Sequence, residues 1–590
     1  MKKWLLTFYF CSAIVAGCGG GGGSSSPTFG GGTGATVISA ADGSAMVYGS
    51  VTISSLVDNT SFSSTANING NLAIPTSGVT FPAIVKVQSL SGGKANYGYI
   101  ASSAQASAPV NPLSTLILSI ASNGNPATIT STTQLNSSSL AVAKTAVNAI
   151  FKSVFQAFSV SGSTDLLSTN FPTDHTGLDL ILDALNVKFD ATGNPTICTK
   201  LLNACKTLDL ANLDTTAFSI SASEVSFLNS APIASCSNAI SSLTASSITT
   251  DSTLYASDFL NSGLNAQAYR QSLSAKFGGM DATFNSPIFI GTDSSNSYVF
   301  QFDYINTSTN QYAGSFTIPF KIDSSGKCVM AGDQLPFFIQ VTSQITVQTR
   351  VDGTSNAAAT TSSPVRGLVF KAGGDASVQD TVTVNGSPVT IKSLQFYMCD
   401  SSNNCSNRLM DMVKGTNNNG YYYTPNGVNT IPVIGYSTAG INTPDAFYNG
   451  NVNPILVKMI DSGGIEQKRF YLKIKGSYIT AAEMNAITLP SITNAQAILG
   501  TSGALVNPSL TINVPTGTIV QSVSLASGLV SGQVTGTSKF VLSGTSLSTA
   551  INRTIDSSSD YRSIQLSAST TSGTPISIKY VWSPTCSGCV

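Results

Sequence analysis

The sequence predicts a mainly β protein, made of several β-sandwich-like domains with one inserted helical region. Short runs of alternating apolar and polar residues, separated by turn residues, recur along most of the 590 residues. Charged residues make up only 9% of the chain, against about 25% in ordinary soluble domains, and Ser, Thr, Asn and Gly take their place. Apolar residues at helical spacing are concentrated between about residues 126 and 280.

The amino terminus has the layout of a secretory signal peptide, which we assign to residues 1–17. Lys2 and Lys3 precede a mostly apolar run over residues 4–15. This run is too short for a transmembrane helix, which needs roughly 20 apolar residues. Cys11 lies inside the run, and we interpret it as an apolar filler.

The signal peptide ends in the residues VAGC at positions 15–18, which resemble the lipobox of Gram-negative bacterial lipoproteins. The resemblance implies that Cys18 becomes the new amino terminus, with a diacylglyceryl group on its sulfur and an acyl chain such as palmitate on its amine. Two or three long chains hold a protein on a bilayer, because each buried methylene contributes about 0.8 kcal/mol. The alternative is an ordinary cleaved secretory signal followed by an incidental cysteine.

Residues 18–43 are rich in Gly and Ser, and we expect them to form a disordered tether behind the lipid. A chain of about 25 such residues has an end-to-end distance of roughly 25 to 30 Å. Position 19 is Gly and not Asp. By resemblance to lipoprotein sorting, this favours the outer membrane, and it leaves open whether the protein faces the periplasm or the cell surface.

Charge and cysteine content narrow the functional classes. The chain has 28 basic and 28 acidic residues, so it lacks the clustered positive charge that nucleic acid requires. An even number of cysteines in an exported chain favours disulfides. Proximity along the chain pairs Cys198 with Cys205, Cys399 with Cys405 and Cys586 with Cys589, and leaves Cys236 for Cys328.

We expect a β-sandwich domain over residues 44–125. Val47, Gly49, Val51 and Ile53 alternate on one face of a strand, and Asn69–Gly70 between two strand-like arms predicts a hairpin. These residues resemble the carboxypeptidase-regulatory-like β-sandwich. The segment VNPLSTLILSIA that follows resembles one that recurs in bacterial lipoproteins, and the resemblance implies no activity.

Residues 126–280 form the helical or mixed region. Apolar residues three and four apart predict one amphipathic helix over Ser138–Phe158. Shorter helical patterns follow in GLDLILDALNV and in FLNSGLNAQAYRQSLSAKF, and the cysteines 198 and 205 lie in a small stapled insert between them.

Strand patterns dominate the rest of the chain. We expect a β-rich domain over residues 281–485, in which SYVFQFDYI and SFTIPFKID form a hairpin with an aromatic face. A last domain over residues 486–590 has short strands at sandwich spacing. It resembles fibronectin type III and immunoglobulin-like modules.

Few residues suggest catalysis. His175 is the only histidine, and a hydrolase would pair it with Asp174, Asp179 or Asp183 and a serine, but no nucleophile motif accompanies it. One histidine with oxidisable cysteines predicts no metal site, and we expect no cofactor. The terminal CSGC could be a redox pair, yet it lacks the following helix that such pairs use, so a structural disulfide or a free pair is favoured.

Two features raise the possibility of carbohydrate binding. Tyr421, Tyr422 and Tyr423 could present rings to a sugar, although consecutive tyrosines in a strand would alternate between faces. A glycosidase needs two carboxylates about 5 to 9.5 Å apart. The candidates are Asp303, Asp323, Asp333 and Asp400.

The sequence therefore predicts a lipid-anchored envelope or cell-surface protein with a non-catalytic binding, adhesion or structural role. The expected partners are the membrane, through the lipid, and polysaccharide or envelope proteins. The alternative is a glycan-active hydrolase displayed on a lipoprotein tether.

Overall fold

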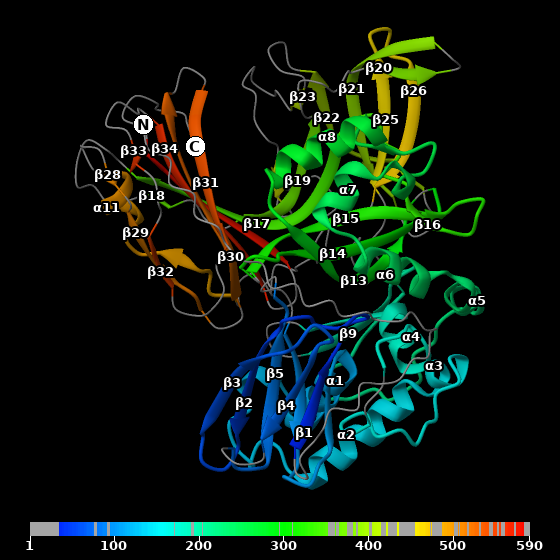
Figure 1. Cartoon of the computed structure of the whole chain (residues 1–590), viewed down its shortest axis with the longest axis vertical. Coiled ribbons are helices and arrows are strands. Elements are labelled where there is room, and N and C mark those ends of the chain that lie inside the picture. The colour runs from blue at the N-terminus through cyan, green and yellow to red at the C-terminus, as the bar shows by residue number, and fades with distance from the viewer. Residues whose placement is uncertain are drawn as a thin grey trace, which may run out of the picture.

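The chain forms a series of separate, mostly antiparallel sheets, and a block of helices packs against two of them (Figure 1). This confirms the predicted fold class. The structure is a computed structural model, and it describes residues 35–582 apart from internal segments 76–78, 91–94, 170–171, 190–193, 203, 294, 310, 352–359, 362–364, 374–380, 385–386, 400–403, 415–419, 423–432, 436–454, 473, 475–486, 501–504, 507, 516–517, 530–532, 542–546, 551–553, 556–560 and 571–573. The expected signal peptide and lipidated Cys18 lie outside the described residues.

Two sheets enclose the core of the first unit, drawn in blue in Figure 1. One sheet has the order β4-β1-β7, with strands Asn71–Pro75, Ala35–Ala40 and Ser107–Val110. The other has the order β3-β2-β5-β6, with strands Ser61–Thr65, Ser50–Ser55, Ala83–Gln88 and Ala95–Ile100.

Strand β1 corrects the expected end of the tether at residue 43. Ile38 is fully buried and Ala40 is 2% exposed, and both belong to the core between the two sheets. The strand pairs with β4 on one side and with β7 on the other. The folded unit therefore begins by residue 35, because these apolar residues are buried by pairing on both edges.

The predicted hairpin at Asn69–Gly70 is also wrong. Strand β3 pairs with β2 and strand β4 pairs with β1, so the turn connects the two sheets and does not join paired neighbours. The Asn67 side chain accepts hydrogen bonds from the amides of Asn69 and Asn71, at 2.8 and 3.0 Å. A Cβ at Gly70 would lie 2.6 Å from the Ala40 carbonyl oxygen. The glycine thus permits the turn to lie close against the end of its neighbouring strand β1.

The helical block follows. Its described helices are α1 Pro112–Ser122, α2 Ser137–Ile150, α3 Lys152–Ala157, α4 Gly177–Ala184, α5 Ala222–Ser230, α6 Ile233–Ser241, α7 Ala245–Thr250 and α8 Ala266–Phe277, with short 3-10 turns at Pro126–Thr128 and Ser252–Leu254. The single helix expected over Ser138–Phe158 is broken at Phe151, which has φ −93° and ψ 6°. Among the described residues, no helix is long and apolar enough to cross a membrane.

Within this block, a small three-stranded sheet carries the first disulfide. Its strands are β8 Leu185–Phe189, β9 Pro195–Thr199 and β10 Cys205–Thr207. Cys198 and Cys205 are register partners and form a disulfide. A two-stranded ribbon, β11 Leu260–Asn261 and β12 Leu264–Asn265, precedes α8.

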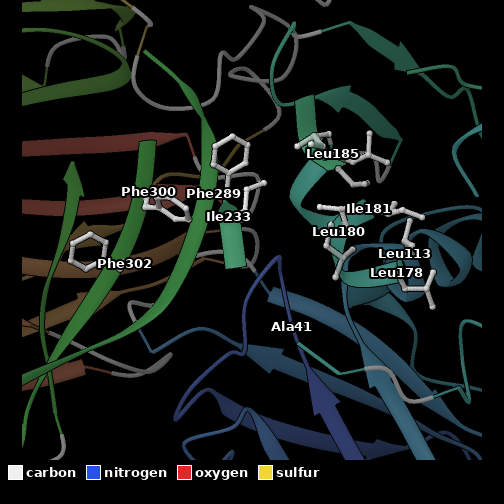
Figure 2. Close-up of a cluster of buried hydrophobic side chains, with 14 of the residues drawn as sticks. Ala41, Leu113, Leu178, Leu180, Ile181, Leu185, Ile233, Phe289, Phe300 and Phe302 are labelled. Atoms are coloured by element: carbon white, nitrogen blue, oxygen red, sulfur yellow. The ribbon is translucent and has the colours of Figure 1, made fainter. Parts of the chain in front are cut away.

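A four-stranded sheet and the helices share one core. The sheet has the order β13-β14-β15-β16, with strands Ala282–Thr292, Tyr298–Asn306, Gln311–Ile322 and Cys328–Met330. Strands β14 and β15 form the expected hairpin, with Phe302 opposite Phe316. Figure 2 shows Phe289, Phe300 and Phe302 of this sheet near Ile233 of α6.

Fourteen of the described strands form one large sheet. They are β17 Ile339–Val351, β18 Thr360–Thr361, β19 Val365–Gly373, β20 Thr381–Val384, β21 Ser387–Met398, β22 Asn407–Lys414, β23 Gly420–Tyr422, β24 Val433–Gly435, β25 Ile455–Asp461, β26 Glu466–Leu472, β30 Thr518–Leu529, β31 Gln533–Val541, β34 Tyr561–Thr570 and β35 Pro575–Trp582. Smaller pairings add β27 Ser491–Ile492, β28 Leu505–Val506, β29 Ser509–Asn513, β32 Leu547–Ala550 and β33 Thr554–Ile555, and helix α11 spans Ala495–Leu499.

Strand β17 connects two cores across the boundary expected at residue 486. Ile339 and Val341 belong to one hydrophobic cluster, while Ile345 and Val347 belong to that of the C-terminal strands. Its second half runs parallel to β35. The C-terminal unit is therefore completed by a strand from the preceding region, which the short-range patterns could not show.

Candidate functional site

Three parts of the chain meet at the loop over residues 41–49, which we call the junction loop. It connects β1 to β2 and contacts strand β13 through Ser286. The Ser286 hydroxyl donates to the Ala45 carbonyl oxygen at 2.8 Å and accepts from the Val47 amide at 3.3 Å. The first sandwich is thus bonded directly to the four-stranded sheet.

Helix α4 approaches the same loop at Gly43. A Cβ at this glycine, whose φ is +75°, would lie 3.0 Å from Asp183 Oδ1 and 3.4 Å from Lys200 Nζ. Lys200 in turn donates to the Phe289 carbonyl oxygen of β13 at 2.9 Å. Charged groups from α4 and from the end of β9 therefore lie against a loop position where a Cβ would be crowded.

A cavity of about 170 Å³ lies between the junction loop and strands β13 and β14. Its lining combines two carboxylates, Asp42 and Asp303, with the amide of Gln301 and the hydroxyls of Ser44 and Ser286. Apolar side chains of the loop complete the wall. This lining offers both donors and acceptors to a small polar group.

Asp303 is the half-buried acid of this cavity. The Ser315 hydroxyl donates to its Oδ1 at 2.6 Å, and that hydroxyl lies 2.7 Å from the Tyr312 hydroxyl. Burial raises the pKa of Asp303 to about 6, although the hydrogen bond from Ser315 acts in the opposite direction. The carboxyl is therefore partly protonated in mildly acidic solution.

Behind the junction loop, His175 meets two aspartates of α4. His175 precedes the helix with φ +60°, and Asp179 and Asp183 follow at intervals of four residues on the same face. The His175 Nδ1 lies 2.7 Å from Asp183 Oδ2 and 3.9 Å from Asp179 Oδ2. The His175 backbone amide also donates to Asp179 Oδ2 at 2.7 Å. We call these three side chains the His–Asp cluster.

The His–Asp cluster is buried and only partly satisfied. Both aspartates are fully buried, while 7% of the His175 side chain is exposed. Asp179 Oδ1 and Asp183 Oδ1 have no hydrogen-bond partner in the structure. Since an unpaired buried polar atom costs about 1 to 3 kcal/mol, the arrangement is costly unless another group completes it.

Burial and charge set the protonation of the cluster. Burial alone would lower the pKa of His175, but its hydrogen bond to Asp183 and the charges of Asp183 and Asp179 outweigh this, and the pKa is raised. Burial and the neighbouring Asp183 charge raise the pKa of Asp179 to about 7. The imidazole of His175 therefore faces two buried carboxylates, and Asp179 holds its proton more tightly than an exposed aspartate does.

The sequence predicted part of this site. It named His175 with Asp174, Asp179 and Asp183, and the structure brings Asp179 and Asp183 to the imidazole. Asp174 bonds the Thr176 amide and hydroxyl instead. Gly43, Lys200 and Ser286 were missed, because no local pattern reports contacts between segments this far apart in the chain.

The other predicted acids have separate partners. Asp323 accepts from Ser325 and Lys327 within a turn. Asp333 accepts from the amide and hydroxyl of Ser262, which lies in the turn of the β11–β12 ribbon. Asp303 bonds Ser315, as described above, and Asp400 lies outside the described residues. Asp303, Asp323 and Asp333 therefore each accept hydrogen bonds from a different segment of the chain.

The remaining candidates are the tyrosines and cysteines. Tyr421 and Tyr422 belong to strand β23, paired with β19 and β22, and Tyr423 lies outside the described residues. Cys236 is joined to Cys328 and Cys399 to Cys405, which are the pairs proposed from the sequence. Cys11, Cys18, Cys586 and Cys589 lie outside the described residues.

Comparisons with known proteins give limited information. No family model and no curated protein matches the chain. A solved tetra-tandem repeat from the extending region of a large adhesion protein is 13% identical to this chain, with a TM-score of 0.11. The match covers 51% of this chain and 65% of that structure, which is under two thirds of its length. A Ca²⁺-stabilised adhesin with which an Antarctic bacterium binds ice is 8% identical, covers 93% of this chain and 98% of its own, with a TM-score of 0.11. At these TM-scores neither likeness supports an argument about fold or function.

Proposed function

We propose that the protein is an exported, lipid-anchored component of the outer membrane that uses its β domains for non-catalytic binding or adhesion. The observation that carries the export step is the disulfide between Cys236 and Cys328. Both cysteines are buried, at 0% and 4% exposure, and the bond links helix α6 to strand β16. Such bonds form and persist in oxidising compartments outside the cytoplasm.

The anchor rests on the resemblance of VAGC at residues 15–18 to a lipobox. With the folded part beginning by residue 35, the tether between Cys18 and the first strand is shorter than the glycine pattern alone implied. The first sandwich would then lie close to the lipid headgroups.

The binding role is supported by the character of the surfaces. The chain carries equal numbers of basic and acidic residues, so long-range charge steering contributes little to recognition. Hydroxyl and amide groups, such as those around the junction cavity, suit hydrogen-bonded recognition of a neutral partner. A polysaccharide or an uncharged face of an envelope protein has that chemistry.

The anchor is tested by membrane fractionation of cells that produce the full chain. We expect the Cys18→Ser variant to leave the membrane fraction, while Cys11→Ser remains there and is processed like the natural chain. Metabolic labelling with a fatty acid should mark only chains that retain Cys18. A Cys18→Ser chain that stays in the membrane fraction and is labelled would contradict the proposal.

The binding role is tested by protease shaving and by attachment. Digestion of the region after Asp281 in intact cells would show a surface position, and protection until permeabilisation would show a periplasmic one. Purified protein should be retained by the matching polysaccharide, surface glycan or peptidoglycan, without releasing soluble sugar. Release of reducing sugar would instead support the glycan-active hydrolase.

A further inference from the structure

We infer that the His–Asp cluster is a binding site for one divalent transition-metal ion, with Zn²⁺ as the ion to test. The donors are His175 Nδ1 and one carboxylate oxygen each from Asp179 and Asp183. One ligand atom from each residue lies within 4.8 Å of the other two. This inference does not depend on the proposed function.

The unsatisfied carboxylate oxygens are an independent indication of a missing ligand. Asp179 Oδ1 and Asp183 Oδ1 belong to fully buried residues and have no hydrogen-bond partner in the structure. Native proteins rarely leave such atoms without a partner, and a bound ion is one established explanation. The two aspartates come from successive turns of one helix, so a single ion can reach both.

Charge balance also favours a divalent cation. A metal ion binds the deprotonated donors, and in that state the two carboxylates carry two negative charges while the imidazole is neutral. One divalent ion brings the total to zero, which avoids the cost of a net buried charge. Lys200 Nζ lies near the same Gly43 position as Asp183 Oδ1, and it donates to the Phe289 carbonyl oxygen of β13.

The donor set identifies the class of ion. Imidazole nitrogen suits Zn²⁺ and related transition metals, whereas Ca²⁺ and Mg²⁺ prefer oxygen donors alone. Zinc binds imidazole nitrogen at about 2.0 to 2.1 Å and carboxylate oxygen at about 2.0 to 2.2 Å. Binding would replace the 2.7 Å hydrogen bond between His175 and Asp183 with two metal bonds. The ion can enter from solvent at the His175 side chain, of which 7% is exposed. Water can supply a fourth ligand.

A bound ion would act on the junction as well as on the helix. Asp183 is the residue whose Oδ1 faces Gly43 of the junction loop. An ion that holds the Asp183 carboxylate in place would also hold the surface against which the junction loop packs. We therefore expect metal binding to slow proteolysis of the junction loop in addition to stabilising α4.

The test measures Zn²⁺ binding by the full chain without a histidine tag. After removal of metal by a chelator, elemental analysis should find one tightly held Zn²⁺ per chain on reloading. Asp179→Asn and His175→Gln should weaken binding at least about tenfold, the lower end of what is lost when even an outer residue of a metal site is removed. Asp209→Asn, an exposed aspartate bonded within its own turn, is the matched control and should bind as the natural chain does.

The terminal CSGC is the competing zinc site, and Co²⁺ separates the two. A cobalt complex of the His–Asp cluster shows visible d–d bands without thiolate charge transfer, and a Cys586→Ser, Cys589→Ser chain should give the same spectrum. Thiolate bands that this double variant abolishes would overturn the inference. So would a reloaded natural chain without Zn²⁺, or equal affinity in folded Asp179→Asn and Asp209→Asn chains. If the cluster variants do not fold, the cobalt spectrum of the natural chain decides.

Discussion

Gly43 shows how much of the junction depends on one missing side chain. Its positive φ is common to many turn glycines, but its surroundings are not, because Asp183 Oδ1 and Lys200 Nζ both lie close to where a Cβ would be. A helix, a strand end and a loop can therefore approach one another. No sequence pattern distinguishes this glycine from those in open turns.

Replacing Gly43 with alanine should therefore cost more than backbone strain alone. Strain at a positive φ costs about 1 to 3 kcal/mol, and the 3.0 Å contact with Asp183 adds to it. Gly464→Ala is the matched control, because that glycine has φ +80° with no atom within 4 Å of the Cβ position. Chemical denaturation should show a larger loss of unfolding free energy for Gly43→Ala. Equal losses would mean that Asp183 moves aside freely.

Asp303 should make stability depend on pH between about 4 and 6. Its raised pKa of about 6, against an unfolded value of about 3.9, means that the folded state holds the proton more tightly in that window. Lowering the pH from 7 to 4.5 should therefore raise the melting temperature of the natural chain relative to Asp303→Asn.

Asp323 provides a control of opposite sign. Hydrogen bonds from the Ser325 hydroxyl and backbone amides lower the pKa of this exposed carboxyl. Its contribution to stability is present above the unfolded pKa and is lost as the pH falls through the folded pKa. Lowering the pH from 7 to 4.5 should therefore not raise the melting temperature of the natural chain relative to that of Asp323→Asn. If the melting temperature of the natural chain rose relative to both variants, burial of Asp303 would not be the cause.

At the scale of elements, local chemistry explains where the helices begin. The Asn111 side chain accepts from the amides of Leu113 and Ser114 at 2.9 and 3.0 Å, and Pro112 occupies the first turn of α1. Asn136 caps α2 in the same way. The two caps differ in environment, since Asn111 is 1% exposed and Asn136 is exposed.

Asn111→Ala should therefore be the more damaging of the two cap substitutions. Loss of an asparagine cap costs about 0.5 to 2 kcal/mol, and at Asn111 it also leaves buried amides without a partner. Thermal unfolding followed by circular dichroism should show a lower midpoint for Asn111→Ala than for Asn136→Ala. Equal midpoints would mean that water reaches the first turn of α1.

Elements were predictable where their pattern is local, and their partners were not. The alternation in residues 298–304 and 316–322 predicts a hairpin, and the register places Phe302 opposite Phe316. Asn69–Gly70 has an equally strong local signal, but its flanking strands enter different sheets. In the cluster, the spacing of Asp179 and Asp183 shows a shared helix face, yet the turn that brings His175 back to them depends on its positive φ.

At the scale of the molecule, the Cys198–Cys205 and Cys236–Cys328 disulfides differ in the length of chain they close. Cys198 and Cys205 are 7 residues apart, whereas Cys236 and Cys328 are 92 apart. Because loop-closure entropy grows with loop length, replacing Cys236 and Cys328 by alanine should cost about 2 kcal/mol more than replacing the short pair. Denaturant titration of the two double variants measures this. The reverse order would show that the longer loop is already ordered in the unfolded chain.

Strand β17 also has a consequence for the order in which the chain can mature. Thr346 pairs with Ser577, so the middle of the sheet has an open edge until nearly the whole polypeptide has been synthesised. Contacts this distant in sequence form slowly, and an unpaired strand edge invites association with other chains. During synthesis from the amino terminus, β17 therefore exposes an edge that other chains can pair with, until β35 is available to cover it.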